Sequence, residues 1–212
     1  MNLPNTDTAV ASKAEVDIDQ DKLVYLETFG CQMNKLDSEL AMQELNASGF
    51  TFTDSMNSAD LILFNTCAVR DQAENRVRSR LGLLKFPKNR KQGSVVAVMG
   101  CMAQREGDDL LKRSKAVDLV VGTKTFMEIP ELYRQAKYAK ERKVAAEIAH
   151  DFRYTRDGQD RRETHRDYES ITRGCVFKCT YCIVPKTRGI AQILPLHAIT
   201  DTEIRLVDGA LT

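Results

Sequence analysis

The sequence has no long hydrophobic run, and this absence is its first informative feature. None of its apolar stretches approaches the roughly 20 residues that a membrane-spanning helix needs. The first 21 residues also lack the apolar core of a secretory signal peptide. Hydrophobic residues make up 42% of the chain and charged residues 29%, which is typical of a soluble globular protein. We therefore expect a cytoplasmic, monomeric protein without a membrane partner.

An overall excess of charge of one sign is missing too, because the net charge of the 212 residues is only +1. Two local segments are nevertheless basic. Residues 70–91 carry eight Lys and Arg against two acids, and residues 173–188 carry Arg173, Lys178, Lys186 and Arg188 with no acid. Patches of this kind suit a polyanion such as RNA. Taken alone, the 70–91 run is more typical of a solvated helix face.

Six cysteines are present, and they need a different explanation from the disulfides of secreted proteins. Without a secretory signal the thiols are expected to stay reduced. Reduced cysteines that cluster by spacing are typical of metal or redox ligands.

Three short apolar segments, each with the character of a buried strand, end on a cysteine. They are 23–31 (LVYLETFGC), 61–67 (LILFNTC) and 94–101 (SVVAVMGC). Helical spacing of apolar residues follows each of them, with Gly49 as a stop for the first helix, Pro87 beyond the second, and a third helix from about Gln104 to Arg113. A fourth strand at 116–122 leads into a helix over 126–142 and carries no cysteine.

Strands that alternate with helices predict an α/β fold with a parallel, Rossmann-like sheet. In such sheets ligands bind beyond the carboxyl ends of the strands. A lone cysteine beside a strand is usually a small buried hydrophobe. Three at equivalent strand ends instead favour one shared metal site, and we name them the sheet-edge cysteines: Cys31, Cys67 and Cys101.

A change in composition predicts the domain organisation. Residues 1–21 are polar and acidic and are expected to form a disordered lead-in to a first domain over 22–143. Residues 144–167 are highly charged without periodicity and are expected to be a linker, in or near which His150 and His165 are interpreted as solvated. A second domain would occupy 168–212, beginning with a short strand over 168–172.

The second domain opens with the triplet cysteines, Cys175, Cys179 and Cys182, spaced C-x3-C-x2-C. A structural zinc site usually has four ligands, and His165 is the only nearby candidate for the fourth. An iron–sulfur cube held by three thiolates would instead keep one iron open for a substrate or cofactor. The spacing favours the cluster, with zinc as the alternative.

The triplet and its surroundings resemble the radical S-adenosylmethionine (SAM) methylthiotransferase family. The matching segments are GCQMNKLDSE (30–39), NTCAVRDQAENRV (65–77), GC (100–101), VDLVVG (117–122) and RGCVFKCTYCIVPKTRG (173–189). The resemblance implies that the triplet cysteines hold a SAM-binding 4Fe-4S cluster, with Tyr181 as a cofactor-binding aromatic. It also implies that the sheet-edge cysteines hold a second 4Fe-4S cluster.

The family's reaction follows from the same resemblance. A SAM-derived radical would abstract hydrogen from C2 of N6-dimethylallyladenosine at tRNA position 37, where a methylthio group is then added. The implied partners are a tRNA anticodon loop and an electron donor protein. No catalytic side chain is assignable beyond the cysteine ligands.

The pattern weakens after Gly189, where only Pro195 stays in register with the family. The family's second domain is a partial TIM barrel, and residues 168–212 would supply only its first strand–helix unit. We therefore expect this chain alone to be inactive. The alternatives are an iron–sulfur module without catalytic activity and an unrelated zinc-binding domain.

Overall fold

The computed structural model describes residues 21–86, 89–147 and 170–194. The predicted lead-in apart from its last residue, most of the predicted linker with its two histidines, and the segment after residue 194 lie outside the described residues.

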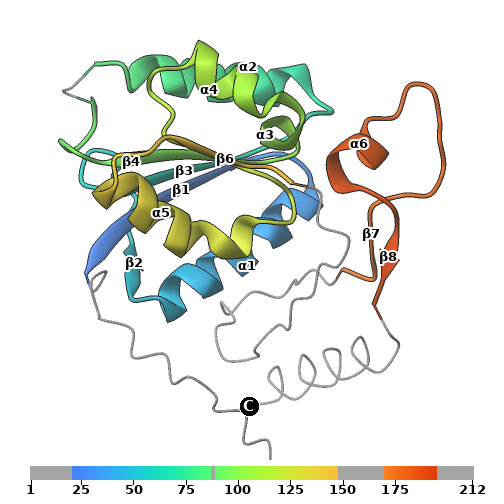
Figure 1. The fold of residues 1–212 in the computed structure, drawn as a ribbon, viewed down its shortest axis with the longest axis horizontal. Coiled ribbons are helices and arrows are strands. Elements are labelled where there is room, and N and C mark those ends of the chain that lie inside the picture. The colour runs from blue at the N-terminus through green and yellow to red at the C-terminus, as the bar shows by residue number, and fades with distance from the viewer. Residues whose placement is uncertain (1–20, 87–88, 148–169, 195–212) are drawn as a thin grey trace, which may run out of the picture.

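A six-stranded parallel sheet, in the order β2-β1-β3-β4-β5-β6, forms the centre of the fold (Figure 1). Its strands are β1 (Lys22–Phe29), β2 (Phe50–Phe52), β3 (Leu61–Thr66), β4 (Val95–Gly100), β5 (Leu119–Val121) and β6 (Lys143–Ala145). The helices between them are α1 (Gln32–Ala47), α2 (Asp71–Leu83), α3 (Cys101–Glu106), α4 (Asp108–Arg113), the 3-10 helix η2 (Phe126–Glu128) and α5 (Ile129–Tyr138). The predicted α/β fold with a parallel sheet is confirmed.

Helices cover both faces of the sheet, with α1 and α5 on one side and α2, α3 and α4 on the other (Figure 1). Every residue of β3 and β4 is therefore buried. Side chains of a strand alternate between faces, so Leu61 and Leu63 enter one core while Ile62 and Phe64 enter the other. This two-sided burial explains why the central strands are continuous apolar runs.

The edge strands β2 and β6 are three residues long, too short to show an alternating pattern. Because β6 pairs with β5, the sheet extends to Ala145, two residues beyond the predicted end of the domain at residue 143. Among the residues that the structure describes, no helix has the length and apolar character needed to cross a membrane.

Two helix predictions need correction. The third predicted helix starts at Cys101 rather than Gln104, and it is divided into α3 and α4 at Gly107, whose φ of +46° breaks the helical path. The last predicted helix ends at Tyr138. Beyond it, the Arg142 side chain donates hydrogen bonds to three backbone carbonyls, those of Leu111, Ser114 and Val117.

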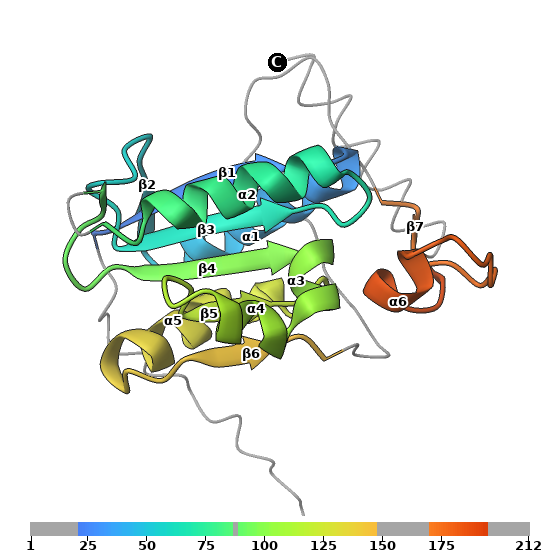
Figure 2. The same cartoon turned by 90° about the horizontal axis from the view of Figure 1, so that it is seen from above.

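The segment 170–194 forms a small unit of its own, with β7 (Thr172–Arg173), α6 (Val184–Arg188) and β8 (Gln192–Ile193). β7 and β8 pair antiparallel. The unit lies beyond the arrowheads of the central strands, at the carboxyl edge of the sheet (Figure 2). The predicted second-domain strand lies partly outside the described residues, and the partial barrel stays a prediction.

Candidate metal centre

The sheet-edge cysteines follow three neighbouring strands, β1, β3 and β4, at one edge of the sheet. The strand register pairs Phe29 with Thr66, and Thr66 with Gly100, so the three strand ends are level. Cys31 lies two residues after β1, Cys67 follows β3 directly, and Cys101 is the first residue of α3. The predicted placement at a shared carboxyl edge is confirmed. Since α1 and α2 leave on opposite faces, the β1–β3 boundary is also the switch point of the sheet, where ligands of such folds bind.

The three thiols differ in exposure. Cys67 and Cys101 are buried, at 2% and 7% exposure, whereas Cys31 is half-buried at the N-cap of α1. The Cys31 thiol donates to the side-chain oxygen of Asn34 at 3.3 Å, and the backbone N–H of Val69 donates to the Cys67 sulfur at 3.3 Å. All six cysteines of the chain are free thiols.

Cys101 has the most charged surroundings of the three. Burial raises the pKa of its thiol, while the Arg188 guanidinium beside it, and a hydrogen bond with Thr187, act in the opposite direction. Both of these residues come from α6, in the unit that lies against the sheet edge. The Cys101 thiol therefore already faces a cation that would stabilise its thiolate.

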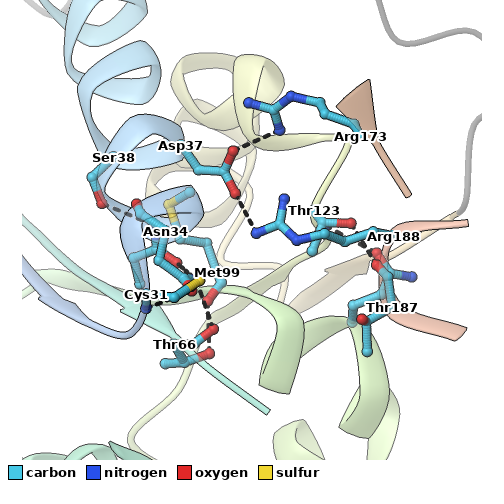
Figure 3. A network of polar contacts seen from close by, with 12 residues as sticks. Cys31, Asn34, Asp37, Ser38, Thr66, Met99, Thr123, Arg173, Thr187 and Arg188 are labelled. Atoms are coloured by element: carbon cyan, nitrogen blue, oxygen red, sulfur yellow. Dashed lines mark hydrogen bonds and ion pairs between the residues drawn. The ribbon is translucent and has the colours of Figure 1, made fainter. Parts of the chain in front are cut away.

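Two buried amides connect α1 to the end of β3 (Figure 3). The Asn34 amide donates to the side-chain oxygen of Asn65 at 2.9 Å and to the carbonyl of Thr66 at 3.1 Å. The Asn65 amide donates to the carbonyl of Asn34 at 2.7 Å and to the Ser38 hydroxyl at 2.9 Å. Both side chains are fully buried. This network holds the segment that carries Cys31 against the segment that carries Cys67.

The triplet cysteines lie in the loop 174–183 between β7 and α6, which we call the triplet loop. Its base is tied by a hydrogen bond from the backbone N–H of Cys175 to the carbonyl of Gly189 at 3.1 Å. Cys179 is exposed, and Cys175 and Cys182 are half-buried. Tyr181 is 91% exposed. The loop thus has a fixed base and an open, thiol-bearing tip.

One buried carboxylate joins the triplet loop to the sheet edge (Figure 3). Asp37 of α1 is fully buried and accepts from Arg173 at 2.6 Å and from Arg188 at 2.8 Å. Both arginines are themselves buried. The prediction that residues 173–188 form one polyanion-binding patch is therefore wrong for these two residues, which neutralise an internal acid. Lys178 and Lys186 remain exposed.

Within residues 21–86, 89–147 and 170–194, no three Cys, His, Asp or Glu side chains form a group that could hold a metal ion. A four-iron cube is wider than one ion, because its thiolates lie on the order of 6–7 Å apart. The chemistry of the donor set, three thiols at level strand ends, fits such a cluster. Convergence of these thiols on one cluster stays a prediction.

The basic 70–91 run is partly used inside the protein. Arg78 pairs with Glu106 at 2.6 Å, Arg80 with Glu27 at 3.0 Å, and Lys91 with Asp60 at 2.9 Å. Other members of the run border a groove of about 520 Å³ at the amino edge of the sheet, opposite the cysteines. We call this the basic groove; it is lined by Leu84, Lys85, Arg90, Arg113, Lys115 and Ala116.

Fold and site together define a doubly wound α/β protein with two sets of free thiols at the carboxyl edge of its sheet. Residues 23–122 match the family described as uncharacterized protein family UPF0004. The chain is also similar to proteins named tRNA-2-methylthio-N(6)-dimethylallyladenosine synthase. That of Rhodopirellula baltica is 36% identical over 92% of this chain and 43% of its own length. That of Maricaulis maris is 38% identical over 87% of this chain and 41% of its own length. That of Aquifex aeolicus is 37% identical over 90% of this chain and 44% of its own length.

Residues 23–122 thus match the UPF0004 family model, and the chain is similar to enzymes named for tRNA 2-methylthioadenosine synthesis, so the resemblance noted from the motifs is confirmed. A match over 92% of the chain extends beyond the UPF0004 region into the second half of the chain. The chain spans somewhat more than two fifths of the length of these relatives.

Several residues of the site were missed in the sequence, above all Asn34, Asp37 and Asn65, although they lie within the quoted motifs. A signal was available. Asn34, Asp37 and Ser38 continue, at helical spacing, the apolar stripe of α1 that includes Ala41 and Leu45, and all are buried. Polar residues in line with a buried stripe indicate an internal network.

Proposed function

We propose that this chain is the cluster-bearing part of a tRNA methylthiotransferase. The sheet-edge cysteines would hold one 4Fe-4S cluster, and the triplet cysteines would hold a second that binds SAM. The observation that carries the proposal is the level alignment of three cysteines at the ends of three adjacent parallel strands. The proposed reaction adds a methylthio group to C2 of N6-dimethylallyladenosine at tRNA position 37. The enzyme would act in the cytoplasm as a monomer and would receive electrons from a donor protein.

Thiolates are the ligands that iron–sulfur clusters use, and three of them leave one iron of a cube open. Together with SAM, such a cluster would supply one-electron chemistry that activates an unreactive C–H bond. The protein's part is placement. Burial of Cys67 and Cys101 limits the access of water to two of the three sheet-edge thiols, and the open tip of the triplet loop leaves Tyr181 accessible to a cofactor.

Metal analysis after anaerobic reconstitution tests the proposal directly. The chain should take up iron and sulfide in equal amounts, about eight of each for two cubes. Zinc bound without sulfide would instead favour the zinc-binding alternative, which the names of the relatives do not support. Loading of the clusters without any catalytic role would leave the iron–sulfur module as the function.

We expect the 212-residue polypeptide by itself not to methylthiolate tRNA. The reaction requires SAM and the substrate carbon in strict geometry, and small misplacements reduce rates by orders of magnitude. The relatives are more than twice as long as the part that matches. The measurement is mass spectrometry of nucleosides digested from prenylated tRNA after incubation with reconstituted chain, SAM and a strong reductant. Methylthio nucleoside above a no-enzyme control would contradict this expectation while supporting the proposed function.

The basic groove is where we expect RNA phosphates to contact the chain. Among the described residues that line it, the charged ones are all cations: Lys85, Arg90, Arg113 and Lys115. Binding of phosphates to such cations releases counterions and makes affinity fall with salt. Replacing Lys85 and Lys115 by alanine should lower the salt dependence of tRNA binding by about 0.7 to 0.9 per lost contact, as the slope of log K against log salt.

The matched control for the groove is Arg76→Ala, which removes an exposed cation of α2 outside the groove lining. Fluorescence anisotropy of labelled tRNA over a salt series measures all three proteins. An equal loss in the Arg76 variant would assign binding to general surface charge rather than to the groove.

A further inference from the structure

The two arginines that bind Asp37 lie on either side of the triplet cysteines in the sequence. Arg173 ends β7, two residues before Cys175, and Arg188 ends α6, six residues after Cys182. Their side chains nevertheless reach the two oxygens of one carboxylate, at 2.6 and 2.8 Å (Figure 3). A single buried acid therefore closes the base of the loop that carries all three triplet thiols.

The acid itself belongs to the helix that begins beside a sheet-edge cysteine. Cys31 is the N-cap of α1, and Asp37 lies in the second turn of the same helix. Fully buried charges are retained only when they are paired and hydrogen-bonded, so loss of this carboxylate would leave two buried guanidinium groups without their partner. The segments that carry the two cysteine sets are thus joined by a buried ion pair between one carboxylate and two guanidinium groups.

Further contacts attach the base of the triplet loop and α6 to the first domain. The Arg173 guanidinium lies 5.9 Å from the centre of the Phe126 ring. Thr123 donates its hydroxyl hydrogen to the carbonyl of Thr187 at 2.6 Å. Arg188 also interacts with the Cys101 thiol. The base of the triplet loop is therefore held at several points along the carboxyl edge of the sheet.

We propose that Asp37 is a positioning residue: its carboxylate, clamped by Arg173 and Arg188, holds the base of the triplet loop and α6 against the carboxyl edge of the sheet, which carries the sheet-edge cysteines. The proposal rests on the proposed function in assigning clusters to both sets. The clamp itself is a property of the polypeptide and is testable before any metal is loaded. Its loss would free the loop and uncover Cys101, while the sheet stays folded.

The experiment compares the full chain with Asp37→Asn, which keeps the shape of the side chain and removes its charge. Hydrogen exchange followed by mass spectrometry should show about tenfold faster exchange in residues 174–188. Exchange in β3 and β4 should be unchanged. The matched control is Asp60→Asn, another buried acid, which pairs with Lys91 at the amino edge and should leave the triplet loop unaffected.

Thiol alkylation gives a second readout with an internal reference. Cys101 touches the clamp, whereas Cys67 accepts only the Val69 N–H among the described residues. In Asp37→Asn, alkylation of Cys101 should speed up about tenfold relative to that of Cys67. Arg173→Gln, which leaves the Arg188 cation beside Cys101 in place, should reproduce the effect, and combining it with Asp37→Asn should add little, because both substitutions break the same clamp.

Three outcomes would overturn the clamp. Unchanged exchange of the loop would show that the carboxylate does not hold it. Equal acceleration in the loop and in β3 and β4, or of Cys67 and Cys101 alike, would make Asp37 a residue of the whole fold. Failure of the proposed function would give a different result: the wild-type chain would bind no iron, while Asp37→Asn would still exchange faster than the wild type in the triplet loop.

Discussion

Replacing Cys31, Cys67 and Cys101 by alanine should remove about half of the iron and sulfide that the reconstituted chain binds, with the remainder on the triplet cysteines. The two sets lie on separate elements, one at the ends of β1, β3 and β4 and the other in the loop between β7 and α6. Each cube requires its own thiolates, so the loss should be confined to one cluster. Iron and acid-labile sulfide per chain, together with the visible absorption spectrum, measure the result.

The reciprocal variant, with Cys175, Cys179 and Cys182 replaced by alanine, is the matched control because it removes the same number of thiols. It should lose the other half of the iron. Full iron retention in either variant would show that its cysteines are not ligands. Complete loss in both would mean that the two sites do not assemble independently.

Gly100→Ala should lower the free energy of unfolding by about 3 kcal/mol or more. Gly100 has a φ of +96° and a ψ of −161°, a conformation that is essentially restricted to glycine. An added Cβ would lie 2.5 Å from the side-chain oxygen of Asn65 and 2.6 Å from the carbonyl of Thr66. The second contact is with the backbone of β3, which cannot move without disturbing the sheet.

Gly82→Ala is a control for which we expect the opposite change in stability. This glycine lies inside α2, and a Cβ there would meet no other heavy atom within 4 Å. Alanine should raise the free energy of unfolding by about 0.5 to 1 kcal/mol through its higher helix propensity. Denaturant unfolding followed by circular dichroism measures both variants. A Gly100→Ala midpoint equal to that of the wild type would contradict the steric explanation.

The strain expected in Gly100→Ala also bears on the candidate metal centre. Cys101 follows it directly, so displacement of the end of β4 would move this thiol away from the ends of β1 and β3. Glycine at this point is therefore needed where the strand turns into α3 beside the amide network of Asn34 and Asn65.

The local pattern of apolar residues was sufficient to predict the central strands of the sheet. The strands β1, β3 and β4 were predicted because each is a short apolar or alternating run followed by helical spacing, and parallel strands that alternate with helices share one direction. The three-residue strands β2 and β6 carry too little periodicity to be recognised. The division of α3 from α4 depended on a positive φ at Gly107, which glycine permits but does not require.

The sequence by itself determined the two sets of cysteines, their spacing, the parallel sheet and the edge on which the first set lies, because these depend on residue type, short-range periodicity and strand direction. Only the tertiary structure decided the partners of the buried polar residues. Asp37 and Arg188 are 151 positions apart, and the hydrogen bond between them exists because α6 lies against the ends of the strands. Arg173 and Arg188 appear in the sequence as cations suited to RNA, but inside the fold they compensate one buried acid. Burial makes that pairing necessary, since an unpaired charge in a low-dielectric interior is costly.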